Sequence, residues 1–278
     1  MQRVLIAGPV AWNLMIHLES LPRPEPHMVI AERHHEAVGG TSAGKALNLR
    51  RLGVPVTLLT VVGEDSYGRR IVDVLSSAGV EVVVTPSGNG SERHTNLMSG
   101  DGERLSIFLN VPVPVRPVAV SPAALDSAAV VVADLAEHSL PVLRAARAAG
   151  KQIWCDLHDY DGVSEFHREF LDAADCVFVS SGRLADPEAF LAERVAAGAR
   201  LAVCTMGAEG ALALRPGASL VRVPAERVPA VVDTNGAGDA FFAGVLAGHL
   251  RGVSLEESLR DGARAAAAAV QSPGLAGS

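Results

Sequence analysis

The residues best suited to chemistry lie late in the chain, in the stretch "VVDTNGAGDAFFAGVLAGHL" at 231–250. An apolar strand end runs into Gly236, Ala237 and Gly238, and a helix with an apolar face follows. Small residues let backbone N–H groups approach an anion closely, and the start of a helix adds unsatisfied donors and a favourable dipole. The stretch therefore predicts an anion hole suited to a phosphate group.

Asp239 lies in the first turn of this expected helix. A second negative charge beside a phosphate has a use if the carboxylate accepts the proton of a hydroxyl that attacks the phosphate. Phosphoryl transfer depends mostly on positioning and charge stabilisation, so a base of ordinary carboxylate pKa is adequate. The alternative is a plain N-terminal Asp that the helix dipole favours. The residues alone leave both interpretations open.

A second glycine-rich stretch, "GGTSAGKALNLRRLG" at 39–53, has the G-x-x-x-x-G-K spacing of a nucleotide-binding P-loop. A P-loop needs Ser or Thr after the lysine, but Ala46 follows Lys45 here. The preceding "AERHHEAV" is mostly polar, whereas a central parallel strand is a near-continuous apolar run. We therefore expect the phosphate-binding loop to lie elsewhere in the chain, or to be absent.

The elements that must position these loops follow a repeating pattern. From about residue 120 onward, short apolar strands alternate with helices, which implies right-handed βαβ units and a parallel sheet with helices on both faces. Residues 3–7 and 56–63 are expected to join this sheet. Cys155, Cys176 and Cys204 each fall inside a predicted strand, as buried structural thiols do.

Residues 12–38 and 92–110 break this rhythm. Half-polar strands on either side of a turn at Asp101–Gly102 suit a small sheet with one exposed face. We interpret the two segments as a β lid over a site; an ordinary surface hairpin is the alternative. The chain has no long linker and no internal repeat, so we expect one domain over 1–278.

Composition narrows the class of partner. The formal net charge is -7 without a cluster of basic residues, so nothing indicates binding to nucleic acid. The chain opens on the strand-like "RVLIAGPV", with no leader and no apolar run of about 18 residues. The expectation is a cytoplasmic protein that does not bind membranes.

Two sequence signatures resemble those of the ribokinase-like (PfkB) carbohydrate kinase family. "DTNGAGDAFFAG" resembles the C-terminal signature D-T-x-G-A-G-D-x-F, and "GGTSAGKALNLRRLG" with the following "VVGEDSYG" resembles the N-terminal one. The resemblance implies a three-layer α/β/α ribokinase-like fold with a mostly parallel central sheet and a small β lid. It also implies ATP-dependent phosphorylation of an alcohol group on a sugar or related small molecule.

The resemblance also assigns roles to residues. It implies that Asp239 is the catalytic base and that the amides of Gly236, Ala237 and Gly238 stabilise the transferred phosphoryl group. It also implies ATP with Mg²⁺ as the phosphoryl donor and, as a further candidate, a monovalent cation such as K⁺. The Gly-Gly turn then faces the substrate hydroxyls, so the P-loop spacing is a coincidence and Lys45 is expected to be a solvated helix residue. The substrate-side residues implied are Gly39, Gly40, Asn13, Gly44, Asn48 and His94, and the nucleotide-side residues are Ser180, Thr205, Gly207, Gly210 and Ala267.

Departures from the family pattern bear on the acceptor and the metal. Asn13 stands where many members have Asp, and Gly44 replaces the usual Asn, for which Asn48 one turn later is a candidate substitute. The family's N-x-x-E becomes Ser180 with Arg183, which puts metal-linked regulation in doubt.

Two further groups could hold a metal or touch the acceptor. "CDLHDYDGV" holds several ligand types, but no second cluster completes a zinc-type site, so we predict no protein metal centre; the resemblance lets Asp156 shape the active site. Of the lid histidines His34, His35 and His94, the last is the preferred substrate contact.

The resulting prediction is an ATP-dependent kinase of a hydroxymethyl-type alcohol, a homodimer through the lid strands. The alternatives are a nucleoside kinase of the same fold, which an aromatic content of 4% mildly disfavours, and a catalytically weak sugar- or nucleotide-binding protein.

Overall fold

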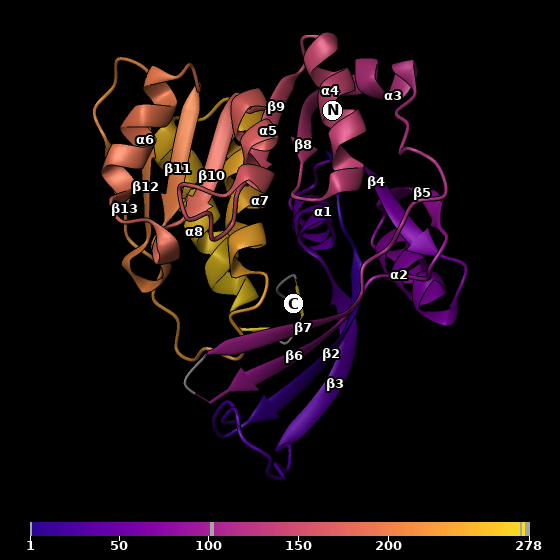
Figure 1. The fold of residues 1–278 in the computed structure, drawn as a ribbon. Helices are drawn as coiled ribbons and strands as arrows, with labels where there is room; N and C mark the ends of the chain where they lie inside the picture. The colour runs from indigo at the N-terminus through magenta and orange to yellow at the C-terminus, as the bar shows by residue number, and fades with distance from the viewer. Residues whose placement is uncertain (1, 101–102, 273, 276–278) are drawn as a thin grey trace.

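The computed structural model describes residues 2–100, 103–272 and 274–275, so the expected turn at Asp101–Gly102 lies outside the described residues. Two sheets organise the chain: a nine-stranded sheet with the order β13-β12-β11-β10-β9-β8-β1-β4-β5 and a four-stranded sheet with the order β3-β2-β6-β7. Figure 1 shows helices packed on both faces of the large sheet and the small sheet projecting from one end of it. The expected three-layer α/β/α fold is confirmed.

The large sheet contains β1 (Arg3–Ala7), β4 (Val56–Gly63), β5 (Glu81–Ser87), β8 (Ala128–Ala133), β9 (Gln152–Asp156), β10 (Cys176–Ser180), β11 (Leu201–Thr205), β12 (Ala211–Leu214) and β13 (Val221–Val223). The helices are α1 (Thr41–Arg51), α2 (Ser66–Ser77), α3 (Pro122–Ser127), α4 (Leu140–Ala148), α5 (Glu165–Ala173), α6 (Pro187–Ala196), α7 (Ala237–Arg251) and α8 (Leu255–Ala269).

Seven neighbouring strands of the large sheet, from β11 to β5, run parallel; β12 pairs antiparallel with β11, and β13 pairs antiparallel with β12. Every residue of β4 is buried, as expected for a strand covered on both faces. The prediction that 3–7 and 56–63 share this sheet is confirmed by the pairing of β1 with β4. The three cysteines are buried on β9, β10 and β11, as predicted.

Two apolar clusters separate the layers. One face of the sheet packs Trp154 and Phe178 against Phe242 of α7, and the other packs Leu143 of α4 and Phe170 of α5. Helices α7 and α8 lie side by side, and α8 begins with a capping box in which Ser254 and Glu257 satisfy each other's backbone amides. This packing fixes the start of α7 against the sheet.

The small sheet is built from the two segments that break the strand-helix rhythm. It contains β2 (Ala11–Leu18), β3 (Arg33–Gly39), β6 (Arg93–Ser99) and β7 (Arg104–Asn110), with β2 and β6 parallel and the other pairs antiparallel. Strand β2 follows β1 after a short loop and β3 leads directly into α1, so the small sheet joins the large one at the carboxyl end of β1. Among the described residues, no helix is both long and apolar enough to cross a membrane.

Candidate active site

Side chains at the ends of two adjacent strands of the large sheet meet at one edge. Asp134 directly follows β8, and Asp156 ends the neighbouring β9. Ligands of open α/β sheets bind at the carboxyl ends of the strands, which is the edge that these two carboxylates occupy. Asp134 is fully buried and accepts a hydrogen bond from the Ser42 hydroxyl at 2.6 Å.

Lys45 lies at the centre of this edge, and the expectation of a solvated helix residue is wrong. Its side chain has no exposed surface. The ammonium Nζ lies 2.9 Å from Asp134 Oδ1, 3.2 Å from Asp156 Oδ2 and 2.9 Å from Asp239 Oδ1. Burial opposes the charge, but the three carboxylates outweigh it and raise the pKa of Lys45.

Helix α1 places the Lys45 side chain at this position. The helix begins after Gly40 and packs against α7. Thr41 and Lys45 are four residues apart and so lie on the same face of α1. Both side chains reach the Asp239 carboxylate, and the ammonium also donates to the Thr41 hydroxyl.

Asp239 lies in the first turn of α7 with its side chain 12% exposed. Its Oδ1 accepts hydrogen bonds from Thr41 Oγ1 at 2.6 Å and from Lys45 Nζ at 2.9 Å. Burial raises the pKa of Asp239, and the stabilising effects of Lys45 and Thr41 do not fully offset it. The carboxylate is thus anchored through one oxygen and more basic than an exposed Asp.

The other carboxylate oxygen of Asp239 lies against Gly44. A Cβ atom added at Gly44 would lie 2.5 Å from Asp239 Oδ2, closer than atoms can approach without a shift. The loss of the usual Asn at this position therefore has a structural consequence that the sequence did not reveal. It makes room for the Oδ2 atom of the expected base.

The expected anion loop leads into α7 as predicted. Gly236 has φ 79° in the left-handed region that glycine favours, and it caps the helix. The Ala237 amide donates to Thr234 O at 3.3 Å and the Ala240 amide to Gly236 O at 2.9 Å. Beside Gly238 there is open space, with no atom of the described residues within 4 Å of an added Cβ. The start of α7 thus offers amide donors at an open surface.

On the small-sheet side, Asn13 of β2 packs against the backbone of Gly39. Asn13 Oδ1 is buried and has no hydrogen-bond partner among the described residues. His94 of β6 lies 2.9 Å from the Glu92 carboxylate, and its ring contacts that of Phe108 on β7 with centroids 3.9 Å apart. Of the three lid histidines His34, His35 and His94, His34 is exposed, whereas His94, the preferred substrate contact, is largely covered.

Asn48 differs from the expectation that it contacts a substrate hydroxyl. Its amide nitrogen donates to Gly44 O and to Leu275 O, both at 2.8 Å, and the residue is buried. Both N–H donors are therefore used to hold the C-terminal segment against α1. A substrate hydroxyl would have to compete with these two backbone contacts.

The residues expected on the nucleotide side lie along the same sheet edge. Ser180 and Thr205 end β10 and β11 and are paired in register. Gly207 and Gly210 flank the short 3₁₀ turn that follows, while Ala267 lies in the last turn of α8. The loop before α7 hydrogen-bonds to the end of α8 through the Val232 amide and Val270 O at 2.7 Å.

In the acidic loop after β9, two carboxylates pair with an arginine. Arg183, which replaces the family's glutamate, lies 3.7 Å from Asp159 and 3.4 Å from Asp161. Over the described ranges, no group of three or more His, Cys, Asp or Glu residues could hold a metal ion.

The sequence reasoning missed two members of the cluster, Lys45 and Asp134. Asp134 had a usable signal, since it ends the apolar run "AAVVVAD" at the carboxyl end of a predicted strand. Lys45 had a weaker one, because it is one of only two lysines in the chain.

Comparisons with known proteins agree with this geometry. A model of the pfkB family carbohydrate kinases matches residues 8–278, so the chain belongs to that family. ATP-dependent phosphorylation of an alcohol group on a sugar or related small molecule is the activity that this membership supports.

Individual relatives cover nearly the whole chain. The acarbose 7(IV)-phosphotransferase of Actinoplanes sp. is 32% identical over 97% of this chain and 92% of its own length. The solved structure titled "Microbiome-derived Acarbose Kinase Mak1" is 31% identical, with a TM-score of 0.87 over 100% of this chain and 96% of its own. The ribokinase of Arabidopsis thaliana, solved with ribose and ATP, shares the fold with a TM-score of 0.81 at 23% identity, covering 98% of this chain and 94% of its own.

Proposed function

We propose that Asp239 is the general base of this kinase and that the amides of Gly236, Ala237 and Gly238 stabilise the transferred phosphoryl group. One observation carries the proposal. The Asp239 carboxylate, largely buried, anchored and with a raised pKa, lies in the first turn of α7. The glycine-capped start of that helix, three residues earlier, opens to solvent. A base and an anion site are thus adjacent, as transfer to a hydroxyl requires.

The hydrogen bonds of the two Asp239 carboxylate oxygens indicate which of them accepts the proton of the acceptor hydroxyl. Oδ1 already accepts two hydrogen bonds, and Oδ2 accepts none from the described residues. We assign Oδ2 to the acceptor hydroxyl, because it is the oxygen with free lone pairs. As the hydroxyl oxygen attacks, its proton moves to Oδ2 while Lys45 and Thr41 keep the carboxyl group in place.

ATP supplies the phosphoryl group, and the open start of α7 fits its phosphates because the amides of a helix N-terminus and the helix dipole favour an anion. Arg183 stands in place of the family's glutamate and pairs with Asp159 and Asp161, so this position presents a positive charge where the family has a carboxylate. Mg²⁺ commonly keeps waters and binds through substrate phosphates, so we propose that the nucleotide carries the ion. A monovalent cation such as K⁺ remains a proposal from the family resemblance, and Ser180, Thr205, Gly207, Gly210 and Ala267 remain the proposed nucleotide contacts.

We propose that the acceptor is the hydroxymethyl group of a sugar bound between the Gly39–Gly40 turn and the small sheet, which acts as a lid. The buried, unpartnered Asn13 Oδ1 and the His94–Glu92 pair supply polar groups for hydroxyls on that side. Two relatives named for acarbose cover almost the whole chain, so acarbose is the first acceptor to test. The catalytic set formed by Asp239, Lys45 and Thr41 favours an enzyme over a weak binding protein.

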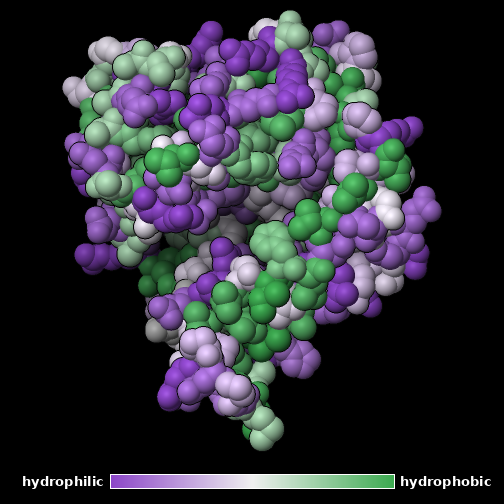
Figure 2. All heavy atoms as spheres, viewed as in Figure 1, coloured by the Kyte–Doolittle hydropathy of each residue, from purple (hydrophilic) through white to green (hydrophobic). Residues whose placement is uncertain are grey.

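The proposed assembly is a homodimer through the small sheet. Strand β7 is its edge, paired within the described residues only with β6. Its side chains Leu105, Ile107 and Leu109 are each about half exposed, at 45%, 44% and 51%. Figure 2 shows apolar residues gathered over this strand and the loop after it. A second copy would cover both the edge and this apolar surface.

The experiment is an acceptor panel with ATP and Mg²⁺. Acarbose, simple hexoses and pentoses, fructoselysine and nucleosides are assayed for ADP release, and each product is located by ³¹P NMR. The proposal expects at least one sugar to accept phosphate on a hydroxymethyl oxygen. A nucleoside as the best acceptor would favour the alternative kinase. Sugar binding without ADP release above the sugar-free rate would contradict the proposed chemistry.

A further inference from the structure

The Lys45 cluster carries more negative than positive charge. One ammonium stands against the carboxylates of Asp134, Asp156 and Asp239, whose side chains are 0%, 11% and 12% exposed. Carboxylates that share a buried site raise one another's pKa, and the most weakly stabilised one takes up a proton. A protonated Asp239 could not act as a base, so its neighbours decide whether it works at neutral pH.

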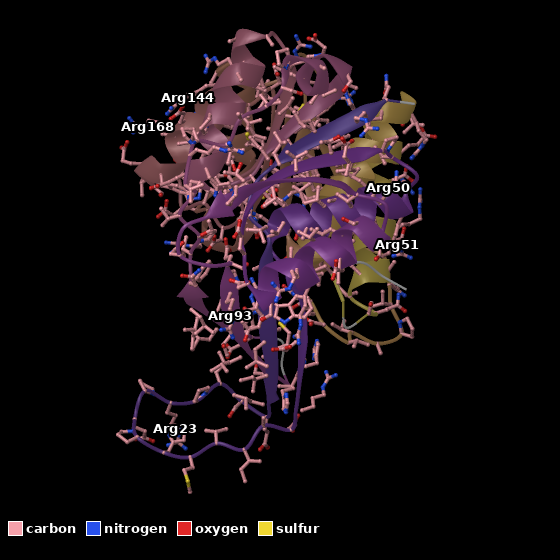
Figure 3. The ribbon with its side chains drawn as sticks, turned by 90° about the vertical axis from the view of Figure 1, so that its right-hand side faces the viewer. Arg23, Arg50, Arg51, Arg93, Arg144 and Arg168 are labelled. Carbon is pink, nitrogen blue, oxygen red and sulfur yellow. The ribbon has the colours of Figure 1, made fainter. Side chains whose placement is uncertain are left out.

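The shape of the cluster suits a lysine. Its ammonium has three N–H donors, and the three carboxylates approach Nζ from separate elements, namely the ends of β8 and β9 and the start of α7. A guanidinium is planar and pairs best with one carboxylate at a time. The basic residues number 24, and only Lys45 and Lys151 are lysines. Figure 3 shows Arg23, Arg144 and Arg168 at the outside of the molecule, where their side chains are 83%, 63% and 65% exposed.

We propose that Lys45 is a positioning residue for the catalytic base: it fixes Asp239 through Oδ1, directs Oδ2 to the acceptor hydroxyl, and keeps the carboxylate ionised among buried acids. Asp134 and Asp156 take part by holding the ammonium at the point where it reaches Asp239. The inference rests on the proposed role of Asp239.

The groups facing Asp239 come from every element packed around it. They are Thr41 and Lys45 on α1, Asp134 after β8, Asp156 at the end of β9 and His158 in the loop after β9. Burial and Asp134 raise the pKa of Asp239, while Lys45, His158 and the Thr41 hydroxyl lower it. Among the groups that favour the ionised form, Lys45 has the largest effect. Removing its charge is therefore expected to raise the pKa of Asp239 further.

The kinetic test compares Lys45→Met with Lys151→Met, the other lysine, which donates to backbone oxygens of Asp126 and Ala128. In Lys45→Met the acid limb of the kcat/KM profile should move up by at least about 1 pH unit, because one opposite charge shifts a pKa by about 1–3 units. Lys151→Met should keep the wild-type limb. An unmoved limb in Lys45→Met would overturn the proposal.

A purely structural role for Lys45 is separated by the double variant Lys45→Met/Asp134→Asn, which restores the charge balance of the cluster. Its urea midpoint should recover toward the wild-type value, while its kcat stays low because nothing anchors Oδ1. Recovery of kcat together with stability would show that Lys45 only balances charge, and would contradict positioning.

A second readout needs no turnover. Lysine-selective ¹⁵N labelling gives two side-chain signals, since the chain has two lysines. The Lys45 Nζ signal should shift with pH as Asp239 ionises, and this shift should vanish in Asp239→Asn. A shift in a protein without kinase activity would leave the pairing intact and remove only the proposed function. A wild-type signal that ignores Asp239 in an active kinase would remove the Lys45 proposal and leave the kinase.

Discussion

Two regions of this molecule reverse the usual distribution of polar and apolar residues, and they do so in opposite ways. At the carboxyl edge of the large sheet, Lys45 and Asp134 are ionisable side chains without exposed surface. On the small sheet, Ile107 and Leu109 are apolar side chains about half exposed to solvent. In the first region the buried charges form ion pairs with one another, whereas no described residue covers the apolar side chains of the second.

The difference indicates what each region is for. Burying charges is costly unless they are paired, and hydrophobic residues of similar size are often as stabilising, so a buried ion cluster is weak support for a stability role. An exposed apolar edge strand likewise adds nothing to a monomer and invites pairing. Departures from consistent burial are expected where function requires them. We therefore connect the buried cluster to chemistry and the exposed strand to assembly.

The sharpest way to break the first half of this comparison is Gly44→Ala. The added methyl group would meet Asp239 Oδ2 at 2.5 Å and displace the carboxylate from its position. A misplacement of this order at a catalytic group costs about 10²-fold in kcat. Gly88→Ala, at an exposed position just after β5 where an added Cβ would make only ordinary van der Waals contacts, is the matched control for a Gly→Ala change. Wild-type kcat in Gly44→Ala would show that Oδ2 is not the reacting oxygen.

The second prediction concerns the pH dependence of stability. Burial works against ionisation of Asp156, but His158 and Lys45 outweigh it and lower its pKa from 3.8 to about 2. Because the folded pKa is depressed, the stabilisation is present above the unfolded value and is lost as pH falls from about 4 to about 2. It amounts to about 2 kcal/mol.

Urea unfolding of wild type and Asp156→Asn between pH 6 and pH 3 checks this value. The wild-type advantage should shrink as the pH falls, while Asp159→Asn, at an exposed position of the same loop, should match wild type throughout. A constant difference between wild type and Asp156→Asn would contradict the paired state of Asp156.

The smallest expected effect concerns the exposed strand. Ile107→Ser and Leu109→Ser should weaken self-association by about tenfold each, which corresponds to about 1.4 kcal/mol. Their free energies of unfolding as monomers should change by only about 0.5 kcal/mol, as at other surface positions. Sedimentation at several concentrations measures the association, with exposed Val163→Ser as the control. A monomeric wild type would refute the assembly.

The fold and the glycine turn before α7 could be predicted because their signals are local. The residues from Asp233 to Asp239 contain a turn, a glycine cap and a helix start, and these features can be predicted from neighbouring residues alone. Strands such as Val56–Gly63 show their burial directly in a mostly apolar sequence. The carboxyl end of each predicted strand likewise indicated where the site would lie.

The environment of Lys45 could not be predicted in this way. A lysine in the first turn of a helix is usually solvated, and its burial here depends on carboxylates that the sheet brings from distant segments. The same holds for Asn48, whose amide is used by Leu275 at the far end of the chain. Contacts of this kind appear only when the tertiary packing is known.

The central claim is that ionised Asp239 takes the proton of the acceptor hydroxyl. The most direct measurement is the single-turnover rate of acceptor phosphorylation against pH, for wild type and Asp239→Asn with ATP and acceptor saturating. The account predicts that the wild-type rate decreases as the pH falls below an apparent pKa, and that this pKa is higher than usual for Asp because burial raises it. The variant should be flat with pH and slower by about 10²–10⁴-fold. A variant that keeps the wild-type rate, or follows the same acid limb, would contradict the account.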